Sequence, residues 1–185
     1  MEISSIFALA VGAIGMIMAI AMFNAMVGRK NQVEYALSSI EAQLKKRFDL
    51  IPNLVAVAEK YLKYESGVLE ELTRCRAKVV SGNLEESELM QIDAQVGKTI
   101  GRLFAVAENY PQLRASEPFL HLQASLNEVE EQLAASRRAF NAAVTDFNNG
   151  CEMFPLNIVA RMMGYMTKQW FQIPEEERQP VKVWR

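Results

Sequence analysis

The sequence predicts an all-α protein, in which an N-terminal transmembrane helix is followed by an up-and-down, coiled-coil-like helical bundle. Three observations predict it: a long uncharged apolar run near the start, apolar residues at alternating three- and four-residue steps after it, and no useful length of strand-like alternation. The 185 residues fit one domain and its anchor. We expect an anchor over residues 1–28, a helical bundle over 29–163 and a C-terminal tail over 164–185.

The apolar run extends from Ile3 to Gly28 without a charge. A bilayer core needs about 20 helical residues, and a segment in lipid must satisfy its own backbone amides, so the run is expected to be a helix in the lipid bilayer. A cleaved signal peptide is the alternative, because residues 19–21 have the small-x-small form of a cleavage site. The run is, however, longer than the usual apolar region of about 7–15 residues, and Glu2 is the only charged side chain ahead of it.

The charges that flank the run predict its orientation. Arg29 and Lys30 follow directly, and residues 45–47 add three more cations, whereas only Glu2 and the amino terminus precede the run. The positive-inside rule therefore predicts a single-pass protein of the cell (inner) membrane, with its N-terminus outside and its bundle in the cytoplasm.

Beyond the anchor, one apolar stripe is interrupted only by Arg47 and Glu65. Pro52 lies within the stripe and removes a hydrogen-bond donor. Because no glycine or turn cluster accompanies it, we expect one kinked long helix, the alternative being a new helix capped by Asp49. The stripe consists of Leu37, Ile40, Leu44, Ile51, Leu54, Ala58, Tyr61, Val68, Leu72, Cys75 and Val79.

Residues 81–83 form a turn signal, and a second helix is expected over about 85–109, stopped by Tyr110 and Pro111. Its inward positions are Leu89, Ile92, Val96, Ile100, Leu103 and Ala107.

Residues 116–118 open the third long helix, with a serine cap and a proline in its first turn, and Gly150 is expected to end it. Its stripe comprises Phe119, Leu122, Leu126, Val129, Leu133, Phe140, Val144 and Phe147.

The last stretch, from Pro155 to Phe171, is rich in methionine and aromatic residues, and a charged tail follows from Pro174. One interpretation is a short helix that closes the bundle core. The other is a contact for a partner subunit or the membrane surface, because Met, Trp and Phe are enriched at interfaces. The candidate oligomer or partner contact is Met162, Met166, Trp170 and Phe171.

Residues for catalysis or for cofactor and metal binding are not evident. A di-iron site needs Glu-x-x-His pairs, whereas Glu117 and the single histidine, His121, are four apart, so His121 is interpreted as a surface residue. Cys75 and Cys151 are expected to be small core residues, with a disulfide between them as the alternative. We therefore expect neither an enzyme nor a cofactor.

The basic residues 45–47 are too few to indicate nucleic-acid binding, and no aromatic residues are interleaved with them. We interpret them as a solvated flank that interacts with acidic residues of a neighbouring helix.

Five runs resemble the LemA family in the same order along the chain. They are QLKKRFDLIPNLV at 43–55, LFAVAENYP at 103–111, EPFLHLQ at 117–123, RRAFNAAV at 137–144 and FPLNIVA at 154–160. The methionine-rich stretch after Ala160 departs from the family pattern. The resemblance implies a bacterial-type membrane protein with an up-and-down helical bundle and no established biochemical activity. It further implies relatives in magnetosome membranes and relatives associated with membrane metalloproteases.

Two functions are consistent with these expectations. The first is a non-enzymatic membrane scaffold that assembles as a homo-oligomer through its helical domain and terminal stretch. The second is an accessory or adaptor subunit of a membrane protease or another envelope-maintenance complex, with a membrane protein as its partner.

Overall fold

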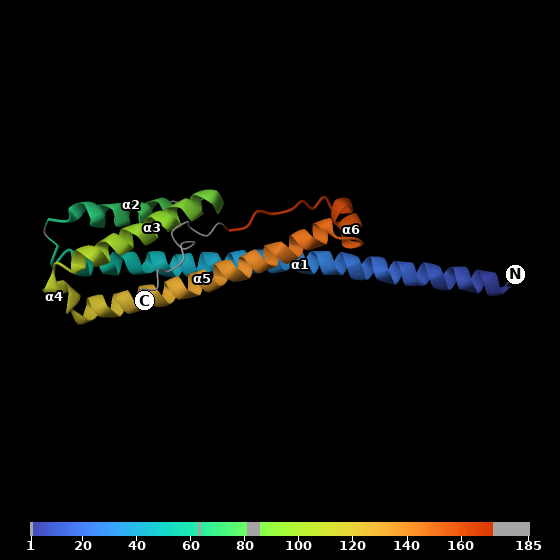
Figure 1. Ribbon diagram of the computed structural model, residues 1–185, viewed down its shortest axis with the longest axis horizontal. Helices are drawn as coiled ribbons and strands as arrows, with labels where there is room; N and C mark the ends of the chain where they lie inside the picture. The colour runs from blue at the N-terminus through green and yellow to red at the C-terminus, as the bar shows by residue number, and fades with distance from the viewer. Residues whose placement is uncertain (1, 63, 81–85, 172–185) are drawn as a thin grey trace, which may run out of the picture. The chain divides into compact units, whose positions relative to one another are not determined.

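The computed structural model describes residues 2–62, 64–80 and 86–171 (Figure 1). The regular elements in these ranges are all α-helices, which confirms the all-α prediction. They are α1 (Glu2–Ala58), α2 (Ser66–Val80), α3 (Glu86–Ala107), α4 (Pro111–Arg114), α5 (Glu117–Glu152) and α6 (Leu156–Met162). Coiled-coil pairing stays a prediction.

The chain divides into two compact units. The first unit contains residues 2–40 and 135–171, and the second contains residues 41–134. The N-terminal part of α1 and the C-terminal part of α5 therefore lie in the first unit, and the rest of each helix lies in the second.

The N-terminal part of α1 is long and apolar enough to cross a membrane, and only 6% of its most apolar window is buried inside the protein. A core helix of a water-soluble domain would bury most of such a surface. Large apolar side chains such as Phe7, Leu9 and Ile14 are instead exposed. This matches the helix predicted for the membrane anchor.

Helix α1 continues through Pro52 to Ala58, as expected for a long helix. The prediction that the same element extends to Val79 is wrong. After Ala58 the chain turns, with the N–H of Leu62 donating to the carbonyl of Ala58 (2.9 Å), and α2 begins at Ser66. The apolar stripe does not reveal this break, because Ala58 and Val68 are core positions on both sides of it.

In the second unit, α3 begins and ends close to the predicted bounds, and its described inward residues are buried: Ile92, Val96, Ile100, Leu103 and Ala107. The short helix α4 was not predicted. Pro111 starts it, and Leu113 is buried, so a residue interpreted as a stop signal begins a new turn of helix. The predicted turn at 81–83 lies outside the described residues.

Every predicted stripe residue of α5 is buried, from Phe119 to Phe147. The predicted end at Gly150 is wrong, because α5 continues to Glu152. A Cβ at Gly150 would lie 2.7 Å from both Met26 Sδ and Arg29 Nη1. The glycine therefore permits a close approach between α1 and α5 rather than ending a helix.

Candidate functional site

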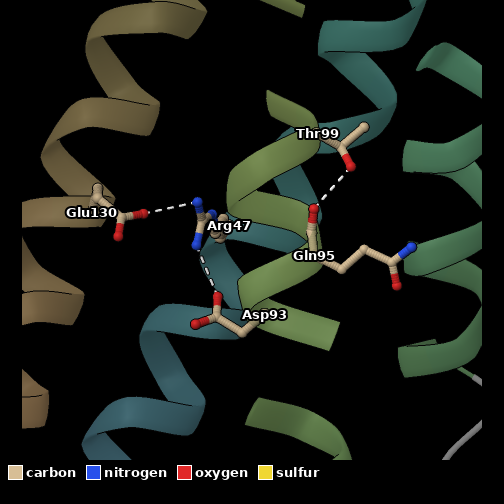
Figure 2. Close-up of polar contacts among 5 residues, drawn as sticks. All are labelled: Arg47, Asp93, Gln95, Thr99 and Glu130. Atoms are coloured by element: carbon tan, nitrogen blue, oxygen red, sulfur yellow. Dashed lines mark hydrogen bonds and ion pairs between the residues drawn. The ribbon is translucent and has the colours of Figure 1, made fainter. Parts of the chain in front are cut away.

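A buried guanidinium connects three helices of the second unit (Figure 2). Arg47 in α1 donates from Nη1 to Asp93 Oδ1 in α3, and its Nη2 lies near Glu130 Oε2 in α5, each at 2.8 Å. Arg47 and Asp93 are buried, whereas Glu130 is partly exposed. This side chain therefore holds α1, α3 and α5 together in the second unit.

Space for this guanidinium comes from Gly97 in α3. A Cβ at this position would lie 3.0 Å from Arg47 Nη2. One turn later in the same helix, a Cβ at Gly101 would meet nothing within 4 Å. The two glycines therefore differ in role, and only Gly97 accommodates the buried charge.

The position of Arg47 refines the sequence interpretation of residues 45–47. Lys45 and Lys46 are exposed, as expected of a solvated flank. Arg47 does interact with acidic residues of neighbouring helices, but from within the core. The sequence carries a signal of this buried position, because Arg47 interrupts the apolar stripe at a point where the helical repeat requires a buried side chain.

A more exposed polar group links α2 to α3. Gln95 donates to Glu71 Oε1 at 3.2 Å, and Arg102 donates to Glu71 Oε2 at 3.1 Å. The hydrogen bond from Gln95, followed by the charge of Arg102, lowers the pKa of the Glu71 carboxyl.

In the first unit, residues 163–171 run back along α5, and we call this segment the strap. Two asparagines of α5 hold it by pairing with its backbone. Asn148 donates to the carbonyl of Lys168 (2.9 Å) and accepts from the Lys168 N–H (2.8 Å). Asn141 makes the same pair of bonds with Phe171, at 3.1 and 2.7 Å. Each side-chain amide thus makes the two hydrogen bonds to the strap backbone that a neighbouring β-strand would otherwise make.

Phe171 is buried at the end of the strap, with 6% of its surface exposed. Its ring meets Phe140 edge to face, with centroids 6.3 Å apart, and the Arg137 guanidinium lies over it at 5.4 Å. Of the four predicted contact residues, this one therefore packs against its own chain, where it fastens the strap to α5.

The other three predicted contact residues are exposed. Met162 at the end of α6 is 83% exposed and Met166 in the strap is 81% exposed. Trp170 exposes more than half its surface while its Nε1 donates to Thr145 Oγ1 at 3.0 Å. The structure thus places Met166 and Trp170 on a segment that Phe171 and the two asparagines hold in position.

The single histidine and the two cysteines are the remaining residues considered from the sequence. His121 is exposed, as interpreted from the sequence. Both cysteines are free; Cys75 is buried as expected of a core residue, and Cys151 is half-buried. Within the described ranges, His, Cys, Asp and Glu side chains form no group of three or more that could hold a metal ion.

Comparison with known proteins places the chain in a family. A sequence model of the LemA family matches residues 36–184. The chain is 26% identical over 155 residues to Protein LemA of Metamycoplasma hominis, in an alignment that covers 84% of this chain and 71% of the relative.

Two further relatives carry the name magnetosome protein. The chain is 24% identical to Magnetosome protein MamQ 2 of Paramagnetospirillum magneticum, over 81% of its own length. It is 22% identical to Magnetosome protein MamQ of Magnetospirillum gryphiswaldense, over 80% of its length. The chain spans 64% of the length of each of these two relatives. The family relatives and the exposed apolar helix α1 together indicate a membrane-associated protein, and by the family match this chain belongs to the LemA family.

Proposed function

We propose that this chain is a non-enzymatic, membrane-anchored helical scaffold that self-assembles at the cell membrane. The observation that carries the proposal is the strap, which presents Met166 and Trp170 to solvent while Phe171 fastens it to α5. A large apolar side chain that is held in place loses little conformational freedom when a second molecule covers it, which favours association.

The magnitudes support an apolar contact over an ionic one. Burial of a large apolar side chain contributes about 1.5–3 kcal/mol, whereas an exposed ion pair contributes about 0–1 kcal/mol. Met162, Met166 and Trp170 are therefore the side chains whose removal should weaken the oligomer most. Lys45 and Lys46 are exposed and should contribute little.

The test is the mass of the full chain after gentle detergent extraction, by light scattering or native mass spectrometry. We expect a homo-oligomer that the double variant Met166→Ser/Trp170→Ser converts to a lower state with unchanged helical circular dichroism. Tyr64→Ser, which removes an exposed aromatic residue of the second unit, serves as the matched control. A wild-type monomer, or an oligomer insensitive to the double variant, would contradict the proposed contact.

A second function, as accessory or adaptor subunit of a membrane protease or other envelope-maintenance complex, uses the same exposed side chains. The mass measurement separates the two functions. A stoichiometric foreign membrane protein that dissociates in Met166→Ser/Trp170→Ser would favour the adaptor.

The orientation that we propose places α2–α6 in the cytoplasm, because Arg29 and Lys30 follow the apolar run and Glu2 precedes it. A reporter fused after Arg185 should then behave as cytoplasmic. Alkaline phosphatase activity from the same fusion would reverse the orientation.

A further inference from the structure

Helices α1 and α5 of the first unit are antiparallel, and their pairing locates the end of α5 relative to the apolar run. Ser39 pairs with Ser136 (3.1 Å) and Arg29 with Asp146 (3.5 Å), and Met26 lies beside Gly150, where a Cβ would be 2.7 Å from its Sδ. Earlier residues of α1 thus face later residues of α5. Met26, the last of these partners, already lies within the uncharged run and is buried.

The chain after Gly150 consequently continues beside α1 residues that belong to the apolar run. Residues 153–158 connect α5 to α6 and include the first turn of α6; we call them the corner (Figure 1). Because α1 rises about 1.5 Å per residue, Met26 lies only about 4–5 Å from Arg29, the first charge after the run. The corner is therefore level with the boundary between hydrocarbon and headgroups.

The outer surface of the corner is apolar. Phe154 is 79% exposed, and Met153 and Ile158 are also exposed. The one fully buried residue of α6 is the small Ala160, whereas Ile158 and Met162 are exposed, so part of the outer face of this helix is apolar. Met162, one turn beyond Ile158, lies where this surface meets the strap.

Cations lie on the elements that adjoin the corner. Arg29 lies beside Gly150 of α5, Arg161 is exposed in α6, and Lys168 of the strap pairs with Asn148 of α5. The hydrogen bond and charge of Lys30 lower the pKa of Glu34 in α1, and the charge of Lys168 lowers it further. Glu152, at the end of α5, is exposed as well. A carboxylate at this point limits the corner to the headgroup level, where anionic lipids attract the cations.

We propose that the corner, through Met153, Phe154 and Ile158, inserts into the interfacial layer of the same bilayer that α1 crosses. The occupant of this apolar surface is lipid, because the corner follows Gly150, which lies beside Met26 and Arg29 at the end of the apolar run, and because cations lie near it. The inference concerns the first unit alone and does not depend on self-assembly. Monotopic helices bind membranes by the same combination of large apolar side chains and a basic border.

The experiment uses the full chain in vesicles of phosphatidylethanolamine and phosphatidylglycerol. Cys75→Ala/Cys151→Ala removes the native thiols, and a nitroxide is then attached singly at Phe154→Cys or Ile158→Cys. Ile14→Cys, within the apolar run, is the lipid control. Tyr35→Cys, an exposed aromatic position of α1 about 10 Å beyond Gly28, is the water control. The measurement compares power saturation by oxygen, which concentrates in lipid, with saturation by a water-soluble nickel chelate.

We expect the oxygen-to-nickel accessibility ratio at 154 and 158 to be several-fold higher than at 35 and lower than at 14, as an interfacial position requires. A ratio at 154 and 158 equal to that at 35 would overturn the proposal. Low accessibility to both reagents, with an immobilised spectrum, would also overturn it and would indicate a second protein copy as the occupant. A water-like ratio at 14 would instead contradict the membrane span of α1. Failure of the anchor can therefore be distinguished from failure of the corner proposal. Unchanged circular dichroism confirms that each labelled protein is folded.

Discussion

Arg47 and Asp93 are far apart in the sequence, yet their charged groups meet at 2.8 Å in the core of the second unit. Both side chains are almost completely buried. A buried ion pair adds little stability over a well-packed apolar pair, but a single buried charge is costly, so the two residues depend on each other.

The first prediction is that Arg47→Met destabilises the protein by about 3–5 kcal/mol, because the Asp93 carboxylate stays in the core without this guanidinium. Chemical denaturation of the detergent-solubilised chain, followed by circular dichroism, measures the change. Lys46→Met, at the exposed neighbouring position, should have little effect. In Arg47→Met/Asp93→Leu we expect part of the stability to return, and a double variant no more stable than Arg47→Met would contradict the mutual dependence.

The second prediction compares two glycines of α3 that are one turn apart. Gly101→Ala should stabilise the protein by up to about 1 kcal/mol, since alanine favours helix and its Cβ meets open space. Gly97→Ala should lose this gain or be destabilising, because its Cβ presses on a guanidinium already held by two carboxylates. Thermal or chemical unfolding of both variants tests the difference, and equal stabilisation would show that Arg47 moves freely.

The third prediction concerns the strap. Asn148→Ala removes both hydrogen bonds to Lys168 and should cost about 1–3 kcal/mol in local stability. Hydrogen exchange should show faster exchange of the Lys168 amide, with the main helices unaffected. Asn149→Ala, at the exposed adjacent position, is the control. Unchanged exchange at Lys168 in the Asn148 variant would mean that the asparagine does not hold the strap.

The fourth prediction concerns acid. The pKa of Glu71 is lowered in the folded protein from its ordinary value of 4.5, so its carboxylate form stabilises the fold. This contribution is fully present above pH 4.5 and is lost as the pH falls through the folded pKa. The difference in unfolding free energy between wild type and Glu71→Gln should therefore shrink below pH 4.5. Glu70→Gln, at an exposed neighbouring position, is the comparison, and a difference that is constant across this range would contradict the assignment.

Periodicity predicted most of the core, because a helix repeats the same face every three to four residues. Phe119, Leu126 and Phe147 are buried as their spacing requires, and α1 is one helix through Pro52. The turn after Ala58 could not be found in this way. Its residues carry no proline or glycine before Gly67, and the stripe keeps its phase across the turn.

The site was harder to predict, since its side chains have roles that depend on distant partners. Arg47 resembles a surface cation until Asp93 and Glu130 are brought to it by folding. Gly150 resembles a helix terminator until Met26 and Arg29 are seen beside it. Asn141 and Asn148 are seven residues apart on α5, a spacing that places them on one face, but nothing local indicates that this face binds a strap.

The burial of Met26 within the apolar run has a consequence for how the protein meets other molecules. With that run in the bilayer, packing of the first unit begins before the membrane segment has ended, so no flexible tether separates the two. A tethered domain explores a volume whose size is set by its linker. In that arrangement the first unit would stay at a constant height and move by lateral diffusion, so its encounters would take place in two dimensions. Confinement of this kind raises the effective concentration of any partner in the same membrane.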